Sequence, residues 1–432
     1  MNALLLMSSP RSHIIPVEPL IKELKEKNSN NKVYCMSTKN NKDLIEKFGG
    51  IFLEYPDFIE PASCNNLDVN EIMVKTDELW KAGKIEEGYD YIIEKDIESV
   101  FDITKKQIDY LCKIVRSYNI EIIFRDAVDK LGRFVAEKMK LCCIGYMTHN
   151  MYSKKYFERN ANDLYAVFMN AKWRLNQLPQ NYFLNLRSRA EAFYNKFGEK
   201  SFPVYTHHQL DPMSDFTIIF SSESLQPKQS FYEDRKYLII KPLSSRFNIE
   251  FNIDEKLEGF IKSYPRIIYI SSGSFVTQSY HYYKNFIKVF SEYDIGIVVS
   301  AGKFNAPLSK YIKDNNIVNV YISDFIPQKY VLSHTDVFIS SGGQNSILEA
   351  IYYKVPMLIT PMTSEQRMNG LLIKELGIGE TTYSLNNNES IAHQINKLLR
   401  KDINTDKLDQ MAMDLKFAKN DFKPMWEYIY EQ

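Results

Sequence analysis

The sequence predicts an α/β protein of two domains, each with a doubly wound parallel sheet, and three observations support this. The chain has 432 residues, which is too long for one ordinary hydrophobic core. Near-continuous apolar runs, the pattern of buried parallel strands, alternate with amphipathic helical patterns in both halves. The rhythm changes near residues 242–255, which we interpret as the link between the domains.

The N-terminal half, residues 1–245, is expected to form a Rossmann-like domain. It opens with a predicted strand at Ala3–Met7, and the helix after it has its apolar face over residues 17–24. Two insertions with a helical or aromatic-rich composition interrupt the alternation at about 55–118 and 150–210. Further strands are expected at Lys32–Met36, Ile51–Tyr55, Glu121–Phe124, Cys142–Met147, 216–220 and 237–241.

The C-terminal half, residues 246–415, alternates more regularly and is expected to form a second Rossmann-like domain. Helical patterns include Tyr280–Phe290 and Asn345–Tyr353. A last helix at about Asp421–Tyr430, within residues 416–432, is expected to cross back to the N-terminal domain. The strands are expected at Arg266–Ile270, Ile295–Val299, Asn319–Ile322, Val337–Ile339 and Pro356–Thr360.

Composition excludes several classes of protein. Lys plus Arg and Asp plus Glu both total 54, so no bulk field favours nucleic acid or an anionic membrane. No apolar run approaches the length of a membrane helix, and the start of the chain lacks the features of a signal peptide. The five cysteines have no paired Cys-x-x-Cys spacing, which fits a reducing cytosol better than a disulfide framework or a zinc site. We therefore expect a soluble, cytoplasmic protein.

Two residues at predicted strand ends suggest acid–base chemistry. His13 lies between the strand at Ala3–Met7 and the next helix, and ligands of open α/β sheets bind at such carboxyl ends. An imidazole can take a proton from a hydroxyl, although a loop histidine by itself is more often a surface residue. Asp126 follows another strand and can hold such an imidazole in one tautomer. It can equally cap the helix expected near Lys130–Lys140, and Asp129 is a rival for either role.

A phosphate site is expected in the C-terminal half. The strand at Val337–Ile339 runs into a small-residue loop, Ser340 to Gly343, and a helix starts near Asn345. The first turn of a helix has unpaired backbone N–H groups and a partial positive charge. Such a loop therefore suits a phosphate or a diphosphate.

These motifs resemble a known family. The segment from Asp324 to Gln366 is similar to the nucleotide-sugar signature of the UDP-glycosyltransferases, the plant- and macrolide-type members of glycosyltransferase family 1. Ser-His-Ile-Ile-Pro at His13 resembles the segment with the family's catalytic base, and Phe-Arg-Asp-Ala-Val-Asp-Lys-Leu-Gly resembles the segment with its aspartate partner, here Asp126. The resemblance implies a GT-B fold, in which an acceptor-binding and a nucleotide-sugar-binding domain face a central cleft.

The same resemblance assigns roles on the donor side. It implies that Phe325 stacks on uracil, that Gln328 bonds near the nucleoside and that Glu349 accepts bonds from the ribose hydroxyls. Asn345 and Ser346 are implied to contact the diphosphate. The other residues implied to bind the donor are two in the sugar-binding pair and six in the phosphate loops: Glu365, Gln366, Ser272, Gly273, Ser274, Ser341, Gly342 and Gly343.

Two departures from the family pattern stand out. Ser341 occupies the place of the usual diphosphate-binding histidine before Gly-Gly, and its loss of reach is expected to weaken donor binding by about 1–3 kcal/mol. The N-terminal loop has Arg11 where many relatives have glycine near the base. We hypothesise that Arg11 reaches the diphosphate, since a guanidinium suits phosphate oxygens.

Together these features predict an inverting, metal-independent transferase with His13 as base. The implied donor is UDP-glucose or a related UDP-hexose, and the acceptor is a small hydrophobic, aromatic or natural-product hydroxyl compound. No Asp-x-Asp is present, no cofactor is expected, and the protein is expected to be a monomer or homodimer. Two alternatives stay open: a donor-impaired homologue that acts as an auxiliary or binding protein, and a UDP-sugar epimerase on the same fold.

Overall fold

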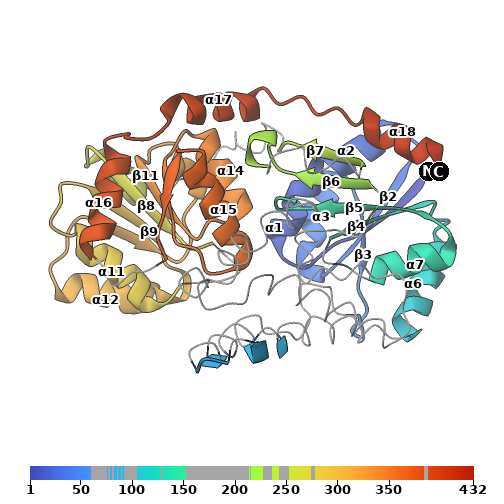
Figure 1. Cartoon of the computed structure of the whole chain (residues 1–432), viewed down its shortest axis with the longest axis horizontal. Coiled ribbons are helices and arrows are strands. Elements are labelled where there is room, and N and C mark those ends of the chain that lie inside the picture. Colours follow the sequence, from blue (N-terminus) through green and yellow to red (C-terminus); the bar gives the residue numbers. More distant parts are fainter. Residues whose placement is uncertain are drawn as a thin grey trace. The chain divides into compact units, whose positions relative to one another are not determined.

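The computed structural model describes most of the chain. The described residues are 1–59, 75, 78–79, 82–84, 86–88, 90–91, 105–127, 129, 131–151, 214, 216–226, 236–242, 253–273, 278–383 and 388–432. Most of the two insertions predicted at 55–118 and 150–210 lies outside these residues. The chain divides into two compact units, each built on its own parallel sheet (Figure 1).

Unit 1 contains a seven-stranded sheet in the order β3-β2-β1-β4-β5-β6-β7, with every described pairing parallel. The strand order reverses between β1 and β4, because the chain first adds β2 and β3 on one side of β1. The strands are β1 (Asn2–Leu6), β2 (Lys32–Ser37), β3 (Ile51–Glu54), β4 (Ile122–Asp126), β5 (Cys142–Met147), β6 (Phe216–Phe220) and β7 (Lys236–Ile240).

Helices cover both faces of this sheet, because alternate strand residues point to opposite faces and both sets are apolar. Leu5 and Phe124 pack in one core with α2 (Glu18–Glu26) and α3 (Lys42–Phe48). Leu4, Leu6 and Ile123 pack in the core on the opposite face with two further helices, α6 (Lys105–Ser117) and α7 (Leu131–Met139). A short helix, α1 (Arg11–Ile14), precedes α2.

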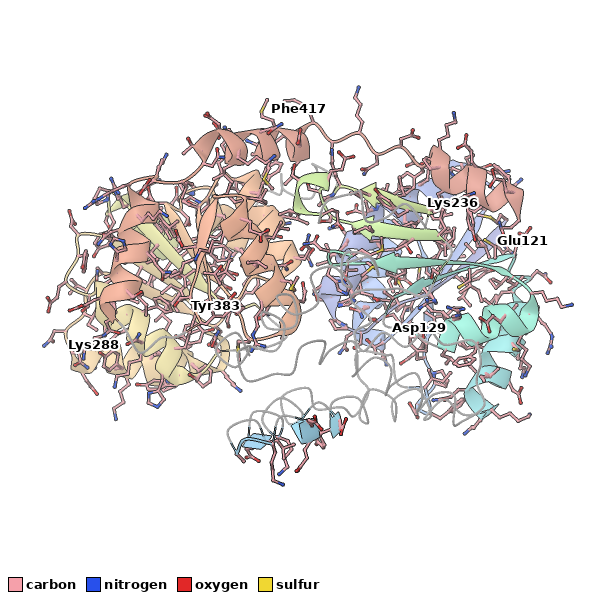
Figure 2. All side chains as sticks on the ribbon, viewed as in Figure 1. Glu121, Asp129, Lys236, Lys288, Tyr383 and Phe417 are labelled. Atoms are coloured by element: carbon pink, nitrogen blue, oxygen red, sulfur yellow. The ribbon has the colours of Figure 1, made fainter. Side chains whose placement is uncertain are left out.

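The last helix, α18 (Lys423–Glu431), belongs to unit 1. Trp426 is buried in the same core as β1, and its Nε1 donates to the Glu23 carboxylate at 2.7 Å. Lys236 on β7 lies beside α18 and forms an ion pair with Glu431 at 2.7 Å (Figure 2). The chain therefore ends inside the unit in which it begins.

Unit 2 contains a six-stranded parallel sheet in the order β10-β9-β8-β11-β12-β13, which reverses between β8 and β11. The strands are β8 (Ile267–Ser271), β9 (Gly296–Ser300), β10 (Val320–Ser323), β11 (Val337–Ser340), β12 (Met357–Ile359) and β13 (Gly379–Thr381). The helices are α10 (Glu255–Lys262), α11 (Tyr280–Phe290), α12 (Asn305–Asp314), α13 (Gln328–Leu332), α14 (Gln344–Tyr352), α15 (Ser364–Glu375), α16 (Asn388–Leu399) and α17 (Thr405–Lys416). Short 3₁₀ helices in the two units are Ile15–Val17, Lys39–Asn41, Glu223–Leu225 and Gly302–Phe304.

The predicted fold class is confirmed: two doubly wound parallel sheets with flanking helices. The predicted strands at Cys142–Met147 and 216–220 match the observed ones, the others differ by one or two residues at an end, and β13 was not predicted. Two differences between prediction and structure concern candidate site residues. Asp126 is the last residue of β4 and does not follow the strand, and His13 lies in the short helix α1 and not in a loop. No helix in the described part of the chain is long and apolar enough to cross a membrane.

Candidate active site

The candidate residues gather at the point where the strand order of each sheet reverses. In an open α/β sheet, the loops after the two strands at this point diverge and leave room for a ligand. In unit 1 these strands are β1 and β4, and in unit 2 they are β8 and β11. The predicted acid–base pair lies at the first point, and the predicted phosphate loops lie at the second.

In unit 1 the structure brings His13 and Asp126 together. The Nδ1 atom of His13 lies 2.7 Å from Oδ2 of Asp126 and 3.2 Å from Oγ1 of Thr148, the residue after β5. The His13 side chain is 20% exposed, whereas that of Asp126 is 1% exposed. An incoming substrate can therefore reach the imidazole but not the carboxylate.

The partner at Nδ1 decides the tautomer of His13. An ionised carboxylate only accepts hydrogen bonds, so we assign the imidazole proton to Nδ1. In the neutral ring, Nε2 then carries the lone pair and can accept a proton. The Asp126 charge also stabilises the imidazolium that results from this proton transfer.

Asp129, the rival of Asp126, has a different role. Its Oδ2 accepts a hydrogen bond from the backbone N–H of Gly132 at 2.8 Å, at the start of α7, and Figure 2 labels it there. Asp129 thus satisfies a donor in the first turn of α7, the role that the sequence left open for Asp126. Burial raises the pKa of the Asp129 carboxyl to about 6, and the nearby Asp126 charge adds to this, while Arg125 and the Gly132 N–H oppose it.

The raised pKa makes Asp129 a source of pH-dependent stability. Its carboxyl binds a proton more tightly in the folded state, so the free energy of unfolding should fall as pH rises from about 4 to about 6, by up to about 3 kcal/mol. Asp129→Asn keeps an oxygen for the Gly132 N–H but does not titrate. We expect urea unfolding to show that the wild type loses stability relative to this variant across that pH window. Parallel curves for the two proteins would contradict the assignment.

In unit 2 the structure brings together three residues predicted to bind the donor: two on its nucleoside side, Gln328 and Glu349, and one at its diphosphate, Ser346. Gln328, the first residue of α13, donates from Nε2 to Oε2 of Glu349 at 2.7 Å and to Oγ of Ser346 at 3.3 Å. Its Oε1 lies 3.5 Å from the Tyr269 hydroxyl on β8. Glu349 and Ser346 lie on α14, so one polar cluster links the first residue of α13 to α14.

The phosphate loop after β11 is tied to the loop after β8. Ser341 is buried, and its hydroxyl donates to the Ser272 carbonyl at 3.1 Å. A serine hydroxyl has one proton, so this bond leaves Ser341 with acceptor capacity only. The candidate phosphate donors are then the backbone N–H groups at the start of α14. The N-cap of this helix, Gly343, has no side chain, and the Gln344 N–H donates to Glu365.

Gly342 is required by the shape of this loop. Its φ is +87°, and a Cβ atom there would lie 2.6 Å from Cγ2 of Ile359. Gly342→Ala should therefore lower the free energy of unfolding by about 1–3 kcal/mol. Gly343→Ala is the matched control, because Gly343 has a φ of −64° and open space at its Cβ position. Thermal and urea unfolding of both variants would test this, and equal losses would contradict it.

The remaining candidates are placed as follows. Phe325, between β10 and α13, is 80% exposed, so its ring face is available for stacking. Gln366 closes a capping box with Thr363 at the start of α15, which gives it a structural role in this state. Glu365 Oε1 lies 3.4 Å from the Gln344 N–H and joins α15 to α14. Gly273 is exposed and has a φ of +81°, and Arg11 is exposed on α1. Ser274 lies outside the described residues.

Sequence reasoning missed two residues next to His13 and Asp126. Thr148 follows β5 and contacts His13 from a neighbouring strand end. Arg125 is fully buried in β4, among Ile122, Ile123 and Phe124. The signal for Arg125 was present, because a charged residue inside an apolar strand has to find partners in the interior.

Comparison with known proteins points to sugar transfer. The family model described as UDP-glucoronosyl and UDP-glucosyl transferase matches residues 308–426. The uncharacterized UDP-glucosyltransferase YojK of Bacillus subtilis is 21% identical over 424 residues, which cover 96% of this chain and 94% of that protein. The NDP-glycosyltransferase YjiC of the same organism is 23% identical over 371 residues, covering 85% and 81% of the two chains. Medicago truncatula UGT71G1, solved with UDP-glucose, has a TM-score of 0.66 at 14% identity and covers 100% of this chain and 97% of its own.

Proposed function

We propose that this chain transfers a sugar with inversion of configuration at the anomeric carbon and that His13 is the general base. The chain belongs to the UDP-glycosyltransferase family and is a UDP-sugar glycosyltransferase of the GT-B fold. The sugar is a hexose, and the acceptor is a small hydrophobic, aromatic or natural-product molecule with a hydroxyl group. The observation that carries the mechanism is the 2.7 Å contact between Nδ1 of His13 and the Asp126 carboxylate.

In this mechanism unit 1 supplies the proton acceptor. Nε2 of His13 accepts the hydroxyl proton of the acceptor as its oxygen attacks the anomeric carbon of the sugar. The developing imidazolium is balanced by Asp126, which is buried and therefore interacts with it more strongly than a solvated carboxylate would. Attack from the face opposite the leaving diphosphate gives inversion.

Unit 2 holds the donor in this proposal. The Glu349 carboxylate accepts hydrogen bonds from the ribose hydroxyls, and Gln328 keeps it in position through the 2.7 Å bond. Phe325 offers an exposed ring to uracil. The diphosphate charge, which grows as the sugar leaves, is stabilised by the backbone N–H groups and dipole of α14 near Asn345 and Ser346.

The departure at Ser341 is compatible with a working donor site. Its hydroxyl secures the Ser272 loop, which lies beside it at the carboxyl end of β8. Ser341 therefore contributes to diphosphate binding by holding the loop, and the direct charge compensation falls to α14. The hypothesis that Arg11 adds a further contact to the diphosphate stays a prediction.

Calorimetric titration tests the donor half of the proposal, with UDP, dTDP and GDP as ligands. We expect UDP to bind more tightly than dTDP or GDP, since Glu349 is suited to a ribose with both hydroxyls. Acceptor candidates are then screened with UDP-glucose for the mass gain of one hexose. Release of an epimerised sugar from a UDP-sugar in the absence of any acceptor would overturn the proposal.

A further inference from the structure

Arg125 is a buried cation that the mechanism above does not use. It occupies the position before Asp126 on β4, and its side chain is fully buried. Burying a guanidinium group costs free energy unless its donors and its charge find partners. The hydrogen-bond partners of Arg125 therefore indicate its role.

Most of those partners lie in the turn that begins at Asp126, the carboxylate partner of the base. Nη1 of Arg125 donates to the backbone carbonyls of Asp126 at 3.3 Å, Ala127 at 3.5 Å and Asp129 at 2.6 Å. Nη2 donates to Oγ of Ser214 at 3.1 Å, from a segment 89 positions further along the chain. One side chain thus holds three carbonyl groups of the Asp126–Asp129 turn and ties that turn to the chain just before β6.

Arg125 and Asp126 extend to opposite faces of the sheet. A Cβ atom on Gly132 of α7 would lie 3.4 Å from Cβ of Arg125, so the arginine faces the side covered by α7. Asp126 contacts His13 of α1. The guanidinium group is therefore linked to His13 through the backbone of Asp126.

The charged groups around the Asp126–Asp129 turn also interact with Arg125. Arg125 lowers the pKa of the buried Asp129 carboxyl, although burial raises it more. Burial raises the pKa values of the Tyr55 and Tyr146 hydroxyls, and the charges of Asp126 and Asp129 add to this effect. Removing the cation would leave the buried Asp129 carboxylate without this counter-charge.

We propose that Arg125 is a positioning residue for sugar transfer: its clamp on the Asp126–Asp129 turn directs the Asp126 carboxylate at Nδ1 of His13 and so sets the tautomer of the base. This inference rests on the proposed function. It extends the His13–Asp126 pair to a third residue that never touches the substrate.

The test combines kinetics with the ¹⁵N NMR signals of the His13 ring, which distinguish a protonated Nδ1 from a protonated Nε2. In the wild type we expect the Nδ1–H form. Arg125→Met should populate the Nε2–H form and lower kcat about 100-fold, as misplacement of a catalytic pair does, with UDP affinity unchanged. Arg125→Lys keeps the charge with fewer donors, so it should fall between the two in both readouts.

Asn319→Leu is the matched control for a merely structural loss. Asn319 is also buried and also donates to three backbone carbonyls, those of Phe290, Tyr293 and Ile295, but at the amino ends of β9 and β10 in unit 2. It should lose stability without any change in the His13 tautomer or in kcat.

The possible outcomes separate the two proposals. A folded Arg125→Met or Arg125→Lys variant that keeps the Nδ1–H form and the wild-type kcat overturns the positioning role, whatever the reaction is. The NMR readout needs no turnover, so it decides the role of Arg125 even if no acceptor is found. A wild type without transfer to any acceptor counts against the proposed function instead.

Discussion

Replacing His13 with glutamine should lower kcat for sugar transfer about 10²- to 10⁴-fold, the contribution typical of a general base. The amide fills a similar volume but cannot take the acceptor proton. UDP affinity should not change, because His13 is not among the residues proposed to bind the donor. Steady-state kinetics with UDP-glucose, together with UDP titration of the same sample, would measure both quantities.

The chemistry of the acceptor sharpens this test. A more acidic hydroxyl needs less help from a base, so the loss in His13→Gln should be smaller for a nitrophenol than for an unsubstituted phenol. His393→Gln is the control, because His393 is exposed on α16 and has no role in the proposal. If His13→Gln kept the wild-type rate with the less acidic phenol, another residue would have to be the base.

The second large effect is expected at Glu349. Glu349→Leu removes a buried carboxylate that is proposed to accept bonds from the ribose, and hydrogen bonds to charged groups contribute about 1.5–3 kcal/mol each. UDP affinity should therefore fall about 10- to 100-fold. Affinity for dTDP should fall less, because its deoxyribose lacks one of the two hydroxyls. Calorimetric titration with both nucleotides measures the difference.

Glu380→Gln is the matched control for Glu349→Leu. Glu380 is also a buried acid of unit 2, and it forms an ion pair with Lys397 at 2.6 Å, away from α13 and α14. It should change stability without changing UDP affinity. An equal loss of affinity for UDP and dTDP in Glu349→Leu would show that the carboxylate does not recognise the ribose and acts only on the shape of the site.

The sheets and their order along the chain could be read from the sequence, because buried parallel strands leave near-continuous apolar runs. Element ends were less predictable. Asp126 was expected after its strand, but its backbone still pairs with Tyr146 on β5, so the strand includes it. The α7 cap was ambiguous because Asp126 and Asp129 both precede the helix, and only the distance to the Gly132 N–H separates them.

Local sequence determined which residue types stand at the carboxyl ends of the strands, namely an imidazole, carboxylates and small-residue loops. Only the tertiary structure decided their partners. The pairs His13 with Asp126, Gln328 with Glu349 and Ser341 with Ser272 are 113, 21 and 69 positions apart in the chain. The pattern of apolar and polar residues in the sequence indicates the environment of each residue. A hydrogen bond between distant residues depends on where two segments of the chain meet, and the packing of the whole unit decides that.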